Sequence, residues 1–188
     1  MIERTLVLIK PDGVTRNLIG KIISRFEDTG LKIIGMKMIQ ANDEIAKRHY
    51  PLDEEWAKNV FEKTKKSYNS QGKELIYKNH LELGKELQSW LCDFLKECPV
   101  VAVVFEGPHA IELVRKITGV TEPRQALPGT IRGDFSSIES YPLANDKKRV
   151  VRNLIHASDS KETAEKEISI WFKQEELHNY KKDIEKYF

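Results

Sequence analysis

Residues 5–9, Thr-Leu-Val-Leu-Ile, form a short and nearly continuous apolar run that the sequence Pro-Asp-Gly ends abruptly. A run without alternating polar positions is typical of a strand that is buried on both faces. Lys10 directly follows the run. Strand ends often carry functional groups in open sheets, although solubilising lysines are also common there. The run therefore predicts a buried first strand with Lys10 at its end.

The segments that follow alternate between helical and strand-like patterns. Apolar residues recur at helical spacing over 18–26, up to Gly30, and strand character resumes over 31–40. Asn42 is suited to cap a short helix through Tyr50. Further along we expect a buried strand over 99–105, a helix over 110–117 that ends near Gly119, and a fourth strand over 150–155. This order indicates an α+β chain with a ferredoxin-like βαββαβ antiparallel sheet and helices packed on one face.

The length of 188 residues suits one domain spanning 1–188. Two segments look like insertions into it, a charged helical stretch at about 53–80 and a polar loop at 136–149. Cys92 and Cys98 are too few and too far apart to suggest a disulfide framework or a four-ligand zinc site, so we expect reduced, structural thiols.

Composition excludes several classes of protein. The chain is 40% hydrophobic and 32% charged with a net charge of +2, typical of a soluble globular domain without a nucleic-acid footprint. No apolar run approaches the roughly 20 residues that span a bilayer, and the N-terminus lacks the pattern of a signal peptide. We therefore expect a cytoplasmic protein with no membrane partner and no stable nucleic-acid partner.

Residues 153–160, Asn-Leu-Ile-His-Ala-Ser-Asp-Ser, place His156 just before groups that could open a helix. A histidine can attack a phosphoryl centre and carry the group on its ring when neighbours fix its tautomer and cations neutralise the phosphate. A lone histidine is more often a core residue, and Ser158 and Asp159 are preferred helix caps, with Glu162 able to complete a capping box from Asp159. Capping and catalysis can coexist at this position.

Residues 127–135, Leu-Pro-Gly-Thr-Ile-Arg-Gly-Asp-Phe, bracket Arg132 between two glycines in a tight turn. Close backbone approach and a planar donor suit a phosphate, and the alternative is an ion pair with Asp134. Taken alone, Arg115 is typical of a solvated helix charge and Thr121 of a local cap.

Familiar signatures are absent from the sequence. The P-loop, dinucleotide, protein-kinase and HExxH motifs do not occur. The remaining histidines share no ligand spacing, so we expect no metal site made by protein ligands alone. We expect surface or packing roles for these residues, which are His49, His80, His109 and His178.

Three blocks together closely resemble nucleoside diphosphate kinases: residues 3–13, the Pro-Gly-Thr-Ile-Arg-Gly-Asp-Phe block, and residues 153–160. The likeness covers nearly the whole chain in order and departs chiefly at the two insertions, as in a long form of the family. It implies transfer of the terminal phosphoryl group of a nucleoside triphosphate, mainly ATP, to another nucleoside diphosphate in ping-pong fashion. It also implies Mg²⁺ carried by the nucleotide, and a homo-oligomer, hexamer or tetramer.

The resemblance further implies roles for individual residues. His156 matches the family nucleophile, Glu167 the carboxylate that orients its ring, and Ser158 a neighbouring hydroxyl. Tyr50 would stand beside the histidine. The positions that match the nucleotide-binding set are Lys10, Tyr50, Arg115, Thr121, Arg132 and Asn153.

The base-stacking position falls in the expanded segment. Counting back from Pro99 places Leu87 there, with Leu91 one turn later on the same helix face. Phe61 or Trp56 could supply the platform instead. A ferredoxin-like nucleic-acid or regulatory module without catalysis is the alternative function, and a scaffold whose insertions bind a protein partner could coexist with catalysis.

Overall fold

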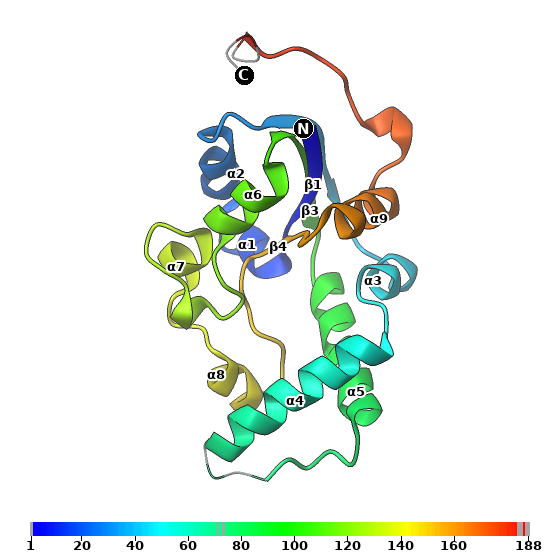
Figure 1. The fold of residues 1–188 in the computed structure, drawn as a ribbon, viewed down its shortest axis with the longest axis vertical. Helices are drawn as coiled ribbons and strands as arrows, with labels where there is room; N and C mark the ends of the chain where they lie inside the picture. Colours follow the sequence, from blue (N-terminus) through cyan, green and yellow to red (C-terminus); the bar gives the residue numbers. More distant parts are fainter. Residues whose placement is uncertain (1, 71, 73, 184–185, 187–188) are drawn as a thin grey trace.

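The computed structural model describes residues 2–70, 72, 74–183 and 186, with an antiparallel sheet at its centre (Figure 1). Its four strands lie in the order β2-β3-β1-β4. They are β1 (Ile2–Ile9), β2 (Lys32–Ile39), β3 (Val100–Pro108) and β4 (Ile155–Ala157). The long register of β1 on β3 runs from Ile2 opposite Pro108 to Ile9 opposite Val101. This order and direction confirm the predicted ferredoxin-like fold.

Helices surround the sheet and continue beyond one end of it (Figure 1). The first group is α1 (Pro11–Thr15), α2 (Ile19–Glu27), α3 (Asp43–His49), α4 (Glu54–Ser70) and α5 (His80–Lys96). The second is α6 (Ala110–Thr118), α7 (Ile131–Ser136), α8 (Tyr141–Asp146) and α9 (Lys161–Trp171), with short 3-10 turns at Pro123–Gln125 and Gln174–Glu176. None of the helices in the described residues is both long and apolar enough to cross a membrane.

Both faces of the sheet are covered, so the expectation of helices on one face is wrong. Val7 and Ile9 of β1 pack in one core with residues of α2 and α6. Leu6 and Leu8 point to the opposite face and pack with residues of α3, α5 and α9. Because alternate residues of a strand face opposite sides, two covered faces require the continuous apolar run seen at 5–9.

Several predicted boundaries are confirmed by local chemistry. The Asn42 side chain accepts a hydrogen bond from the Ile45 amide at 2.8 Å and so begins α3. Helix α6 ends at Thr118, and Gly119 follows with a φ of 86°, a conformation that glycine adopts without strain.

The fourth strand was predicted too early. It covers Ile155–Ala157 rather than 150–155, because Leu154 has a φ of 67°, which takes the chain out of extended geometry. The Leu154 carbonyl accepts from the Lys10 amide at 2.8 Å, and its amide donates to Asp12 Oδ2 at 3.0 Å. These contacts hold the unusual turn and leave His156 at the centre of the short strand.

Two other local predictions are also wrong. Helix α9 is capped by Ser160, whose Oγ accepts from the Thr163 amide at 3.1 Å, so no capping box starts at Asp159. The segment 136–149 is not simply a loop, because Ser140 caps helix α8 within it. At both sites a serine hydroxyl accepts a hydrogen bond from a backbone amide of the first turn.

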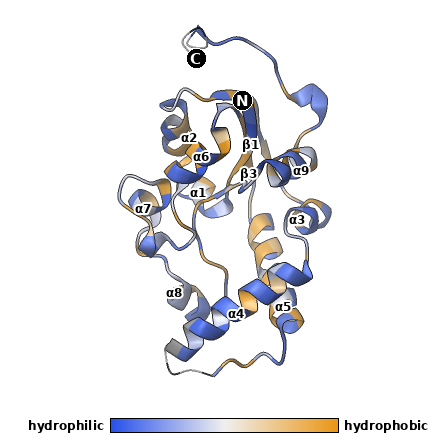
Figure 2. Ribbon diagram, viewed as in Figure 1, coloured by the Kyte–Doolittle hydropathy of each residue, from blue (hydrophilic) through white to orange (hydrophobic). Residues whose placement is uncertain are grey.

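The first insertion forms α4 and leads into α5, and these two helices pack on each other. Figure 2 shows most of α4 as hydrophilic. Helix α5 reaches back into the core beside α3 through Cys92 and Leu95. The assignment of residues 1–188 to one domain with two insertions stays a prediction.

Candidate active site

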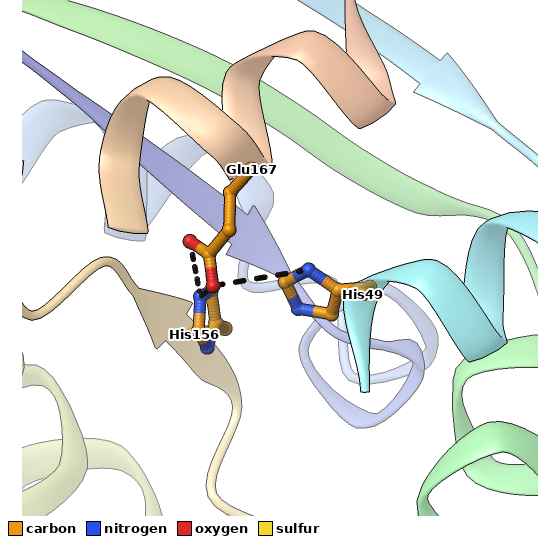
Figure 3. Close-up of side chains that lie close together, drawn as sticks. All are labelled: His49, His156 and Glu167. Atoms are coloured by element: carbon orange, nitrogen blue, oxygen red, sulfur yellow. Dashed lines mark hydrogen bonds and ion pairs between the residues drawn. The ribbon is translucent and has the colours of Figure 1, made fainter. Parts of the chain in front are cut away.

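The catalytic candidates meet where β4 lies beside α9. Strand β4 pairs with β1 so that His156 is opposite Leu8, and Glu167 projects from the buried side of α9 (Figure 3). His156 Nε2 lies 3.0 Å from Oε1 and 2.9 Å from Oε2 of Glu167. Ser158 Oγ donates to Oε2 of the same carboxylate at 2.6 Å.

This arrangement distinguishes the two ring nitrogens of His156. A carboxylate accepts hydrogen bonds, so Glu167 favours the tautomer with its proton on Nε2. Nδ1 is then left with its lone pair. The His156 side chain keeps 22% of its surface exposed while that of Glu167 keeps 9%, so the ring is reachable and its anchor is not.

A second group of predicted residues forms a hydrogen-bonded chain beside the histidine. Lys10 Nζ donates to Asn153 Oδ1 at 2.8 Å, and Asn153 Nδ2 donates to the Thr121 carbonyl at 2.9 Å. Both Lys10 and Asn153 are buried. The structure therefore brings Lys10, Asn153 and the backbone of Thr121 together, while the Thr121 residue itself is exposed.

Arg132 is buried on α7 and is held by backbone oxygens rather than by Asp134. Its guanidinium donates to the carbonyls of Asn153, Gly119 and Ile155 at 3.3, 2.9 and 2.7 Å. Asp134 instead pairs with Arg25 at 2.8 Å. The alternative of an Arg132–Asp134 ion pair is thus wrong.

Burial changes the proton affinity of both cations. It lowers the pKa of Lys10 to about 8, and the nearby charge of Arg132 adds to this shift while Asp12 opposes it. Burial also lowers the pKa of Arg132 to about 10. Two cations held close together out of water favour an anion as their partner.

The other predicted residues lie at the edge of this group. Arg115 is exposed on α6 and lines a surface groove of about 830 Å³ whose lining does not include His156. Its charge contributes to lowering the pKa of Arg132, so the two arginines repel one another electrostatically. Tyr50 is half-buried, and burial with the Glu167 carboxylate raises its pKa.

The candidate base wall lies on the inserted helices. Leu87 and Leu91 are both half-buried on α5, one turn apart. The alternatives Trp56 and Phe61 are half-buried on α4. All four positions therefore remain accessible in part, and the choice among them stays a prediction.

The sequence reasoning missed His49, which was expected to have a surface or packing role. Its ring centroid lies 4.5 Å from that of His156 at an interplanar angle of 83°, and the residue is buried. The position of His49 next to Tyr50 was a weak indication of a role in the site, because the family resemblance places Tyr50 beside His156. No spacing in the chain connects His49 with His156.

One cluster in the described residues has the composition of a metal site. His49, His156 and Glu167 offer atoms that all lie within 4.8 Å of one another. Two nitrogens and a carboxylate suit zinc better than magnesium, which prefers an all-oxygen shell. The hydrogen bonds from His156 and Ser158 already occupy the carboxylate. These three side chains are therefore a poor match for a magnesium ion.

Gly133 shows why the Arg132 segment needs a second glycine. A β-carbon at 133 would overlap the Leu127 carbonyl and meet Thr130 Oγ1 at 2.9 Å. Thr130 is the cap of α7, accepting from the Gly133 amide at 3.1 Å. Replacing Gly133 with alanine is expected to lower the free energy of unfolding by about 1–3 kcal/mol, the usual range for overpacking.

Urea unfolding of the Gly133→Ala variant would measure this loss. Gly20→Ala is the matched control, because Gly20 lies in α2 with nothing within 4 Å of an added β-carbon. That change is expected to stabilise by up to about 1 kcal/mol. Equal stability of the two variants would contradict the steric explanation.

Comparison with known proteins places this geometry in a family. The family model described as nucleoside diphosphate kinase matches residues 3–73 and 67–177. The chain is 45% identical over 180 residues to the nucleoside diphosphate kinase of Pyrobaculum aerophilum, covering 94% of this chain and 98% of that protein. Identity to the Pyrococcus horikoshii enzyme is 47% over 178 residues, covering 95% and 90%.

Solved structures agree with the sequence relatives. The crystal structure of the Pyrobaculum aerophilum NDP kinase superposes with a TM-score of 0.91 at 42% identity, covering 95% of this chain and 100% of that one. A transition-state mimic of the Borrelia burgdorferi enzyme with bound vanadate and ADP gives a TM-score of 0.78 at 38% identity, covering 98% and 95%. By family match, identity and coverage, the chain belongs to the nucleoside diphosphate kinase family.

Proposed function

We propose that His156 carries the phosphoryl group in the reaction of this family, and that Nδ1 is the attacking atom. The chain is a phosphotransferase that acts on nucleoside di- and triphosphates. The observation that carries the proposal is the hydrogen bond between Nε2 and Glu167, because with the proton on Nε2 the Nδ1 atom keeps its lone pair on a ring that is only half-buried. Glu167 and Ser158 would keep the ring in that tautomer.

The reaction then has two balanced half-steps. The Nδ1 lone pair attacks the γ-phosphorus of a nucleoside triphosphate, mainly ATP, as the bond to the β-phosphate oxygen breaks and the diphosphate leaves. A second nucleoside diphosphate enters, and its terminal phosphate oxygen attacks the same phosphorus while the P–N bond breaks. Because one site serves both nucleotides in turn, the kinetics are ping-pong.

The buried cations are proposed to bind the phosphates. Arg115, Thr121 and Arg132 would hold the phosphates, and Lys10 and Asn153 would reach the sugar hydroxyl and the phosphates. Tyr50 would border the histidine. We propose Mg²⁺ as the divalent ion, where bound metal would neutralise phosphate charge and orient the chain of phosphates. Leu87 is our candidate for contact with the base.

We also propose an oligomeric state and a location for the enzyme. We expect a homo-oligomer, hexamer or tetramer, in the cytoplasm, with no stable nucleic-acid partner and no membrane partner. Light scattering of the purified chain would determine the oligomer. A monomer would contradict this expectation.

Incubation with γ-labelled ATP is the direct test of the function. The protein should acquire acid-labile label, and any added nucleoside diphosphate should discharge it. Peptide mapping should place the label on His156. Phosphotransfer without a labelled protein intermediate would overturn the proposal. Salt-dependent binding of single strands without phosphotransfer would instead favour the non-catalytic module.

The lowered pKa of Lys10 predicts a pH dependence of nucleotide binding. Because Lys10 titrates near 8 rather than 10.5, its charge is present below pH 8 and is lost as the pH rises through that value. Affinity for ADP should therefore fall by up to about tenfold per pH unit above pH 8. Calorimetric titrations between about pH 6.5 and 9.5 would measure this decline.

The same shift makes an opposite prediction for stability. Between pH 8 and 10.5 the unfolded chain binds a proton at Lys10 that the folded chain does not. The free energy of unfolding should therefore rise with pH in this window, by on the order of 3 kcal/mol. Lys10→Met should remove this rise, while Lys21→Met, at an exposed lysine of α2, should retain it. A rise that survives in Lys10→Met would contradict the assignment.

A further inference from the structure

His49 is surrounded by aromatic rings, one of which is the ring of the proposed nucleophile, His156. Its side chain has 0% exposure. The ring centroid of His156 lies at 4.5 Å, that of Tyr50 at 4.6 Å and that of Trp171 at 5.6 Å, all with strongly tilted planes. In Figure 3 His49 and His156 flank the Glu167 carboxylate. His49 is thus placed to influence both partners of the catalytic hydrogen bond.

Trp171 determines which nitrogen of His49 carries the proton. Its indole Nε1 donates a hydrogen bond to His49 Nδ1 at 3.3 Å. An indole N–H can only donate, so Nδ1 must accept, and the neutral ring then has its proton on Nε2. Nε2 is buried and finds no partner among the described residues, so no contact on that side favours the other tautomer.

The ring is also neutral. Burial lowers the pKa of His49 well below its ordinary value, and the neighbouring charges of His156 and Lys10 lower it further. A neutral ring with an unprotonated Nδ1 cannot donate to a carboxylate on that side.

The tautomer of His49 determines whether it can compete for the Glu167 carboxylate. His49 Nδ1 lies 4.0 Å from Glu167 Oε1, so a proton on this nitrogen would make His49 a competitor for the carboxylate. With Trp171 occupying Nδ1, Glu167 is left to His156 and Ser158. Glu167 and Trp171 are four residues apart on α9, so one face of the helix presents both groups.

We infer that Trp171 and His49 are positioning residues: the indole N–H holds His49 in the tautomer that cannot bind Glu167, so that Glu167 stays committed to Nε2 of His156. The inference rests on the proposed role of His156 as phosphate carrier. Neither residue touches the nucleotide in this scheme. They act through the orientation and tautomer of the His156 ring.

Trp171→Phe tests the inference, because it removes the N–H donor and keeps an aromatic ring. We expect kcat to fall about tenfold while KM for both nucleotides stays within about twofold. Full displacement of a reacting group can cost about 100-fold, and here the His156 ring is only partly released. Nitrogen-15 spectra of the histidine side chains should show His49 gaining a proton on Nδ1 and His156 losing the single Nε2–H tautomer. Trp90→Phe, a half-buried tryptophan on α5, is the matched control and should behave like the unchanged protein.

Two substitutions of His49 separate its contacts. His49→Gln retains an acceptor for Trp171 in its amide oxygen, whereas His49→Phe keeps a ring and leaves the indole N–H without an acceptor. Of the two, we expect His49→Gln to retain more of the kcat. Unchanged kcat and unchanged His156 resonances in a folded Trp171→Phe protein would overturn the inference.

The failure of the inference can be told apart from failure of the proposed function. If His156 is not the carrier, the unchanged protein itself will lack acid-labile label. If His156 is the carrier but the pair has no positioning role, labelling of Trp171→Phe will proceed at the normal rate. A loss that appears only as a rise in KM would also overturn the inference.

Discussion

Replacing His156 with glutamine is expected to lower phosphotransfer by a factor on the order of 10⁴ or more, because glutamine offers no ring nitrogen to form the P–N bond. The protein should acquire no acid-labile label from γ-labelled ATP. Glutamine can still donate to Glu167, so the fold should keep its stability within about 1 kcal/mol. Single-turnover labelling and urea unfolding would measure the two effects separately.

His178→Gln is the control for this prediction. His178 is exposed beyond α9, and its backbone amide, which the substitution retains, donates to the Ile34 carbonyl at 2.7 Å. Full activity is expected in that variant. If His156→Gln also transfers phosphate at the unchanged rate, the carrier is another group and the proposed mechanism is wrong.

Arg132→Lys is expected to be the most damaging change that preserves charge. The guanidinium donates to three backbone carbonyls, two of which flank the turn before His156 and one of which belongs to Gly119. A lysine cannot reproduce this fork, so buried acceptors lose their partners and the free energy of unfolding should fall by about 3 kcal/mol. Activity should fall as well, by on the order of 100-fold, because the Asn153 and Ile155 carbonyls belong to the segment that positions His156.

Urea unfolding and kcat/KM measured on the same preparation would test this double effect. Arg124→Lys is the matched control, since the Arg124 side chain is 63% exposed. It should change stability by less than about 0.5 kcal/mol. A stable but inactive Arg132→Lys protein would show that Arg132 acts on phosphate alone and not on the strand that carries His156.

The predicted elements succeeded where the pattern was local. The strand at 5–9, the helix capped by Asn42 and the helix ending before Gly119 depend on spacings within one or two turns of chain, which sequence displays directly. The prediction of the fourth strand failed because its start depends on a left-handed residue, Leu154, whose conformation is held by Lys10, directly after β1, and by Asp12 of α1. No local pattern reports such a contact.

Prediction of the site likewise succeeded for individual residues and failed for contacts between distant parts of the chain. Resemblance singled out His156 and Glu167, and the structure places them in contact at 2.9 Å. It could not reveal that Arg132 donates to three carbonyl oxygens, or that His49 lies against His156. Those facts depend on which strands are neighbours.

By itself, the sequence determined the alternation of strands and helices, the apolar run that both faces of the sheet must bury, and the residue types that mark a phosphotransfer site. Only the tertiary structure decided which nitrogen of His156 faces Glu167, what holds Arg132, and that Trp171 and His49 lie beside Glu167. The physical reason is that periodicity and capping are properties of neighbouring residues, whereas tautomers and buried charges are set by partners distant in the chain. Strand order and one left-handed turn bring those partners together.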